Sequence, residues 1–119
     1  MLLVVIESPL GAADREEIER NKSYAKEAML DSLGRGEAPY ASHLLFDQPG
    51  LLDDLVPSER CLGLQAGLAW GEKASLVAVY ADFGISLGMR VGIERATARG
   101  QTIEYRYLKS GNQSYASRV

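Results

Sequence analysis

The 119-residue chain contains only one cysteine, one histidine and one tryptophan, and these scarcities exclude several classes of protein. Because Cys61 has no second cysteine to pair with, no internal disulfide can form, and we expect a reducing, cytoplasmic location. Cys61 itself is expected to pack in the core. A lone histidine without cysteine or carboxylate ligands at metal spacing predicts no metal site.

An excess of positive charge is also lacking. The chain has 13 Lys and Arg residues against 16 Asp and Glu residues, a net charge of -3. Surfaces that bind nucleic acid usually carry a basic patch, so we expect no nucleic-acid polymer as a partner. The apolar opening MLLVVIESP is too short to span a membrane and lacks the basic start of a signal peptide. It predicts a buried strand and no membrane partner.

Glycine is plentiful, but the glycine motifs that hold phosphate are missing. Neither GxxxxGK[ST] nor GxGxxG follows the first apolar run, so the defining elements of P-loop and NAD enzymes are absent, and we expect no cofactor. Gly63, Gly67 and Gly71 instead recur every four residues. Each costs a helix about 1 kcal/mol relative to Ala, which predicts a close contact along that face. We expect this helix and Trp70 to be largely buried. We also expect a homodimer, in which the second copy of the chain completes a ligand-binding cleft.

What is present is a regular alternation of strand and helix patterns. Continuous apolar runs predict strands at residues 2–7, 75–82 and 102–108, and a shorter strand that passes into a loop at residues 38–46. Helical periodicity, with capping residues such as Asp14, predicts helices at about residues 14–34, 58–73 and 86–99. Residues 47–57 read as a surface loop.

This alternation predicts an α/β fold. We expect a three-layer αβα sandwich, flavodoxin-like or Rossmann-like, with a four- or five-stranded parallel sheet in the order 2-1-3-4. Residues 1–108 would form one domain, and residues 109–119 a polar C-terminal tail with a turn at Gly111 and Asn112.

Ligands of such folds bind outside the carboxyl ends of the strands. Ser8, His43 and Asp82 follow the first three predicted strands, and each is either a site residue or an ordinary structural one. Asn21 interrupts the apolar stripe of the first helix, where a buried amide needs a partner. We expect these side chains to converge on one pocket.

The start of the third long helix predicts an anion site. Ser86 is a good N-cap, and the free N–H groups and positive dipole end of a helix favour an anion there. Gly88 would let a ligand approach closely, with Met89 beside it. At 100° per residue, Gly92 lies on the apolar face, whereas Glu94 points to solvent.

Several short motifs resemble the nucleoside 2-deoxyribosyltransferase-like superfamily, which includes deoxynucleoside 5′-monophosphate N-glycosidases. They are SP after the first strand, N..YA in the first helix and SLGMRVGIERA in the third. GEAPYASHLLF, ER..G...G.AW and GIS.GM are more similar to a branch of small phage and bacterial proteins within it. The resemblance implies a flavodoxin-like sheet, a dimer or larger assembly, and a cleft for a nucleoside or nucleotide. It also implies that Ser86 helps to hold a 5′-phosphate.

The sequence departs from these relatives at one position. The resemblance places a nucleophilic glutamate at position 92, where this chain has glycine. Cleavage of an N-glycosidic bond passes through an oxocarbenium-like state that needs a carboxylate near the sugar and an acid near the base. We expect Asp82 to provide the carboxylate, with Glu7 as another candidate, and His43 to protonate the base.

Three functions remain open from the sequence. The first is an enzyme that hydrolyses or transfers N-glycosidic bonds of nucleosides or nucleotides. The second is a non-catalytic nucleotide-binding protein, a sensor or sponge, that uses the same cleft. The third is a different small-molecule enzyme or an interaction module.

Overall fold

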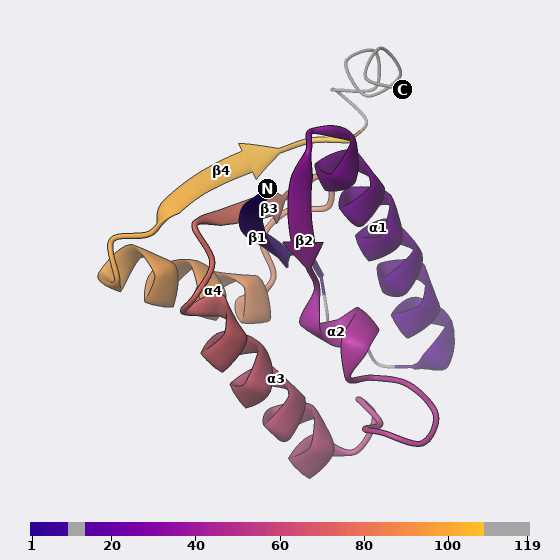
Figure 1. Ribbon diagram of the computed structural model, residues 1–119. Helices are drawn as coiled ribbons and strands as arrows, with labels where there is room; N and C mark the ends of the chain where they lie inside the picture. The colour runs from indigo at the N-terminus through magenta and orange to yellow at the C-terminus, as the bar shows by residue number, and fades with distance from the viewer. Residues whose placement is uncertain (10–13, 109–119) are drawn as a thin grey trace.

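The computed structural model describes residues 1–9 and 14–108, in which strands and helices alternate as predicted (Figure 1). The elements in chain order are β1 (Leu2–Glu7), α1 (Arg15–Gly34), β2 (Glu37–Tyr40), α2 (Ser42–Leu45), α3 (Pro57–Gly71), β3 (Leu76–Tyr80), α4 (Leu87–Ala98) and β4 (Thr102–Arg106). The predicted tail at residues 109–119, with its turn, lies outside the described residues. None of the described helices is long and apolar enough to cross a membrane.

The four strands form one parallel sheet in the order β2-β1-β3-β4, which confirms the predicted topology. Side chains alternate between the two faces of each strand. Val4 and Ile6 of β1 pack with Tyr24 and Ala28 of α1 on one face. On the other face, a second cluster contains Val5, Val77, Val79, Met89 and Ala96. The fold is therefore a three-layer sandwich with α1 on one side and α4 on the other.

The helix starts follow the predicted caps. The Asp14 carboxylate accepts a hydrogen bond of 2.9 Å from the backbone N–H of Glu17, and Ser86 caps α4. One element differs from the prediction, because the loop expected after β2 begins with the helical turn α2. The N–H groups of Leu44 and Leu45 both reach the carbonyl of Ala41. A single turn is too short to show helical periodicity in the sequence.

Of the three glycines of α3, Gly67 makes the close contact that their spacing predicts, whereas a Cβ at Gly63 or Gly71 would meet its neighbours at ordinary contact distances. A methyl group at position 67 would lie 2.6 Å from Cβ of Ser42, so only glycine lets α3 lie this close to α2. The prediction that α3 and Trp70 are largely buried is wrong for the single chain. Only Gly71 is buried in this helix, and Trp70 is 61% exposed. The prediction that Cys61 packs in the core is also wrong, because Cys61 is exposed on this helix.

The helices α3 and α4 are joined at their C-terminal ends. Arg99 donates a hydrogen bond of 3.1 Å to Glu72, and the side-chain amide of Gln101 donates to the carbonyls of Gly71 and Ala74. From this junction the two helices run in different directions (Figure 1). Their divergence leaves room over the sheet face that carries Val5 and Val77.

Candidate active site

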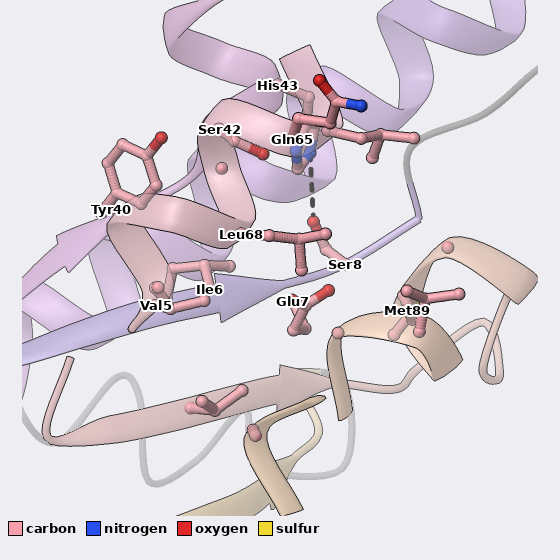
Figure 2. Close-up of a pocket in the computed structure, with 18 of the residues that line it drawn as sticks. Val5, Ile6, Glu7, Ser8, Tyr40, Ser42, His43, Gln65, Leu68 and Met89 are labelled. Carbon is pink, nitrogen blue, oxygen red and sulfur yellow. Dashed lines mark hydrogen bonds between the residues drawn. The ribbon is translucent and has the colours of Figure 1, made fainter. Parts of the chain in front are cut away.

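A cavity of about 250 Å³ lies between α3 and α4, above the sheet face of Val5 and Val77. Its walls are mainly apolar and include Leu64, Leu68, Met89, Val91 and Ala96. Polar side chains gather at the carboxyl ends of β1 and β2 (Figure 2). They are Glu7, Ser8, Tyr40, Ser42, His43 and Gln65. The cavity therefore combines an apolar slot with a polar end, the usual composition of a small-molecule site.

Glu7 is the only acidic residue that lines this cavity in the described part of the chain. It ends β1 on the same face as Val5, so its side chain enters the cavity (Figure 2). Within residues 1–9 and 14–108, no hydrogen bond or ion pair reaches its carboxyl group. Because burial disfavours the charged form, the pKa of Glu7 rises from its ordinary 4.5 to about 8. The carboxyl group of Glu7 is therefore mainly protonated at pH 7.

The Glu7 carboxyl group lies directly against Gly92 of α4. A methyl group at position 92 would lie 2.6 Å from Cδ and 3.0 Å from Oε1 of Glu7, and closer still to Oε2. Gly92 is buried on the face of α4 that the helical periodicity assigned to the sheet. Glycine at position 92 thus leaves the space that the Glu7 carboxyl group occupies, and a side chain there would displace it.

Ser8 and His43 form a buried pair at the polar end of the cavity. Ser8 Oγ and His43 Nε2 share a hydrogen bond of 3.2 Å (Figure 2). Burial and the nearby Lys22 ammonium lower the pKa of His43 to about 4, against the opposing effect of Asp47. The imidazole is therefore uncharged at neutral pH. It can share hydrogen bonds there but is a weak proton donor.

The start of α4 borders the cavity through Gly88 and Met89. Ser86 Oγ accepts a hydrogen bond of 3.3 Å from the Met89 N–H, which confirms the predicted N-cap. A Cβ atom at Gly88 would have no neighbour within 4 Å, so the backbone there is open to a ligand. Glu94 is exposed, as the helical periodicity predicts.

The predicted site residues do not converge on one pocket. Ser8, His43, Gly88 and Met89 line the cavity, whereas Asn21 and Ser86 line a second, open hollow between α1 and the start of α4. This hollow also contains Tyr24 and Phe83, whose rings meet edge to face with centroids 4.8 Å apart. The start of α4 thus separates the two groups of residues.

Asp82 is not among the described residues that line either hollow. Its carboxylate accepts hydrogen bonds from the Tyr24 hydroxyl at 2.5 Å and from the Leu108 N–H at 2.8 Å. These contacts place Asp82 on the α1 side of the sheet, opposite Glu7. Its position favours a structural role that joins α1 to the end of β4.

Sequence analysis did not select Tyr40, Ser42 and Gln65, which also line the cavity. The Tyr40 hydroxyl is buried and has no hydrogen-bond partner within the described residues, and burial raises its pKa to about 12. Tyr40 and Ser42 lie within the motif GEAPYASHLLF, but no pattern in the sequence marks any of the three as a site residue. Glu7 did carry a signal, since it is the one charged residue in the strand LLVVIE.

The described residues contain no group of three or more His, Cys, Asp or Glu side chains that could hold a metal ion.

Among solved structures, the chain is similar to the CMP N-glycosidase BcmB of Clostridium botulinum. The likeness covers 95% of this chain and 82% of the glycosidase, with 14% sequence identity and a TM-score of 0.50. At this identity the likeness establishes the α/β fold alone. No curated protein sequence matches the chain. Residues 2–106 match a family described as a domain of unknown function, and the chain therefore belongs to that family, DUF7768.

Proposed function

We propose that the cavity binds a nucleoside or nucleotide and that the protein hydrolyses or transfers its N-glycosidic bond. The observation that carries this proposal is the single carboxyl group, Glu7, at the polar end of an otherwise apolar slot. The flat, largely apolar faces of a nucleobase suit the walls formed by Leu64, Leu68 and Met89. A ribose would then lie at the strand ends, beside Glu7.

A carboxyl group in this position suits N-glycosidic chemistry. The transition state resembles an oxocarbenium ion, whose positive charge a nearby carboxylate stabilises strongly in an apolar site. The neutral His43 would hydrogen-bond the ligand or the Ser8 hydroxyl instead of protonating the base at pH 7. Asp82, the carboxylate expected from the sequence, would hold the strand ends in place.

The start of α4 would take a 5′-phosphate. Gly88 and Met89 border the cavity on one side, and the Ser86 hydroxyl lies at the cap of the same helix. Backbone N–H groups and the dipole of a helix start stabilise a phosphate there. Asn21, in the adjoining hollow, would contact a part of the ligand that extends beyond α4. The nucleotide named as the substrate of the similar glycosidase supports this ligand class.

We also propose that a second copy of the chain covers α3 in the cytoplasm. Leu62 and Trp70 are 55% and 61% exposed on this helix, and Leu87 and Val91 are exposed on α4. A homodimer through this surface would bury apolar side chains and shield the cavity from water. Light scattering at micromolar concentration should give the mass of a dimer, and a monomeric mass would contradict this assembly.

A nucleotide sensor or sponge without turnover is the second candidate. The glycine at the position where the resemblance expects a nucleophile, together with the neutral state of Glu7, favours it. Such a protein would use the same cavity and the same helix start. The two candidates therefore differ only in whether the ligand is cleaved.

The test is incubation with the common ribo- and deoxynucleoside 5′-monophosphates, the free nucleosides and NAD, followed by chromatography for free base. We expect base release from at least one of these compounds, and a larger yield from the phosphorylated member of a pair. Heat of binding without released base would support the non-catalytic alternative. Neither binding nor release would contradict both candidates.

A further inference from the structure

We propose that Glu7, delivered by β1, is the carboxylate that reacts at the anomeric carbon, and that Gly92 of α4 leaves the space that this carboxyl group occupies. This inference rests on the proposed function and names the residue that performs its central step. The reacting group would come from the sheet, whereas the resemblance to deoxyribosyltransferases places it on the helix.

The first argument is that the two positions compete for one space. Any side chain at position 92 would begin 2.6 Å from the Glu7 carboxyl carbon, so the chain cannot hold both Glu7 as it stands and a larger residue at 92. A carboxyl group reaches this part of the cavity from β1 because α4 has no side chain there. Gly92 also lies in mid-helix, where glycine costs stability relative to Ala, so a specific reason for it is needed.

The second argument is that Glu7 has no structural partner. The other titratable or charged side chains that line the cavity are Tyr40, His43, Cys61 and Arg99. Arg99 is bound to Glu72 at the far end, and His43 is bound to Ser8. A buried carboxyl group without a partner destabilises a fold, whereas a site can use its altered proton affinity.

The reaction then balances with these groups and water. Glu7 first gives up its proton, and its ionised oxygen bonds to C1′ of the ribose as the C1′–N bond breaks. The base leaves with that electron pair and takes up one proton, which balances the one that Glu7 lost. Water next adds to C1′, the bond from C1′ to Glu7 breaks, and one proton is released. The carboxylate is regenerated and the net reaction is hydrolysis; a second base in place of water gives transfer.

The experiment compares base release by the full chain with that of Glu7→Gln, Glu7→Ala, Gly92→Glu and the double variant Glu7→Ala/Gly92→Glu. Glu94→Gln is the matched control, because it makes the same chemical change on the exposed face of α4. The substrate is whichever nucleoside monophosphate, nucleoside or NAD the wild type cleaves. Calorimetry with the same compound reports binding separately.

We expect Glu7→Gln to lower the rate by about 1,000-fold or more while still binding the nucleotide, the usual effect of removing a nucleophile. Glu94→Gln should stay within about twofold of the wild type, since an exposed side chain does not reach the ligand. Gly92→Glu should lose activity, because its side chain displaces Glu7. The double variant should exceed Glu7→Ala by roughly tenfold, because it returns a carboxyl group to the same space.

Base release that persists in Glu7→Gln would overturn the assignment of Glu7 and leave the proposed function standing. If the double variant is no more active than Glu7→Ala, the claim that positions 7 and 92 can place a carboxyl group in the same space is wrong. A wild type that releases no base from any of these compounds would overturn the proposed function and this inference together.

Discussion

At about pH 9, Glu7→Gln should be more stable than the wild type by as much as about 5 kcal/mol, whereas near pH 4 the two should be equally stable. Glutamine has nearly the shape of glutamic acid and keeps the cavity filled, but it carries no proton to lose. The difference between the two proteins therefore measures the cost of ionising Glu7 inside the cavity.

The sign follows from the raised pKa of Glu7, about 8 in the folded protein against an ordinary 4.5. Between these values the unfolded chain has lost the proton and the folded chain keeps it, so each unit of pH lowers wild-type stability. The contribution of Glu7 is fully present below about pH 4.5 and is lost as the pH rises to about 8. Burial is the cause, because the cavity solvates the charge poorly.

Urea unfolding followed by circular dichroism across this range measures the effect. Two other groups also titrate: the pKa of Asp54 is raised to about 6 and the pKa of His43 is lowered to about 4. Both proteins contain these groups, so their contributions cancel in the difference in stability. Glu94→Gln again serves as the control and should run parallel to the wild type at every pH. Stability curves for Glu7→Gln and wild type that also run parallel would show that Glu7 is solvated and ordinary.

This stability effect and the activity effect should have opposite signs in the same variant. A substitution that raises stability at alkaline pH while abolishing base release is the behaviour of a group retained for function. If the role of Glu7 were purely structural, replacing it would instead lower the stability of the protein.

Arg106→Met should destabilise the fold by about 3–5 kcal/mol, the cost of removing one member of a buried ion pair. Arg106 is only 4% exposed and ends β4. Its guanidinium donates hydrogen bonds to both carboxylate oxygens of Glu37 at 2.7 and 2.9 Å, and to the Tyr80 hydroxyl at 3.0 Å. The change would leave the Glu37 charge without its main partner.

The loss should spread beyond the pair, because the contacts form a network. The Tyr80 hydroxyl donates to Asp31 at 2.8 Å, and Ser32 Oγ donates to Glu37 at 2.7 Å. Arg106 thereby connects β4 and β3 to β2 and α1, on the face of the sheet away from the cavity. We expect nucleotide binding to survive in any Arg106→Met molecules that remain folded.

Urea unfolding at pH 7 checks this second effect, with Arg90→Met as the matched control at an exposed position of α4. The double variant Arg106→Met/Glu37→Gln should recover part of the loss, because it removes the unpaired charge. If Arg106→Met unfolds at the same urea concentration as Arg90→Met, the network contributes no net stability.

The architecture could be predicted from local patterns in the sequence. Apolar runs such as residues 76–80 are typical of strands buried on both faces of a parallel sheet, and capping residues such as Asp14 and Ser86 mark helix starts through local hydrogen bonds. These signals involve residues that are only a few positions apart, so they can be recognised in the sequence alone. The helical turn α2 was not predicted, because a single turn is too short to show a helical period in the sequence.

Which of the strand-end residues share a site depends on how the chain packs in three dimensions. Glu7 and Asp82 both follow apolar strands, but successive side chains of a strand point to opposite faces, and the sequence does not say which helix covers which face. Folding turned Glu7 toward α4 and Asp82 toward Tyr24 of α1. The contact between Glu7 and Gly92 joins residues that are distant in the chain. In the sequence, glycine at position 92 therefore looks like a missing nucleophile, whereas in the folded protein it leaves the space that the Glu7 side chain occupies.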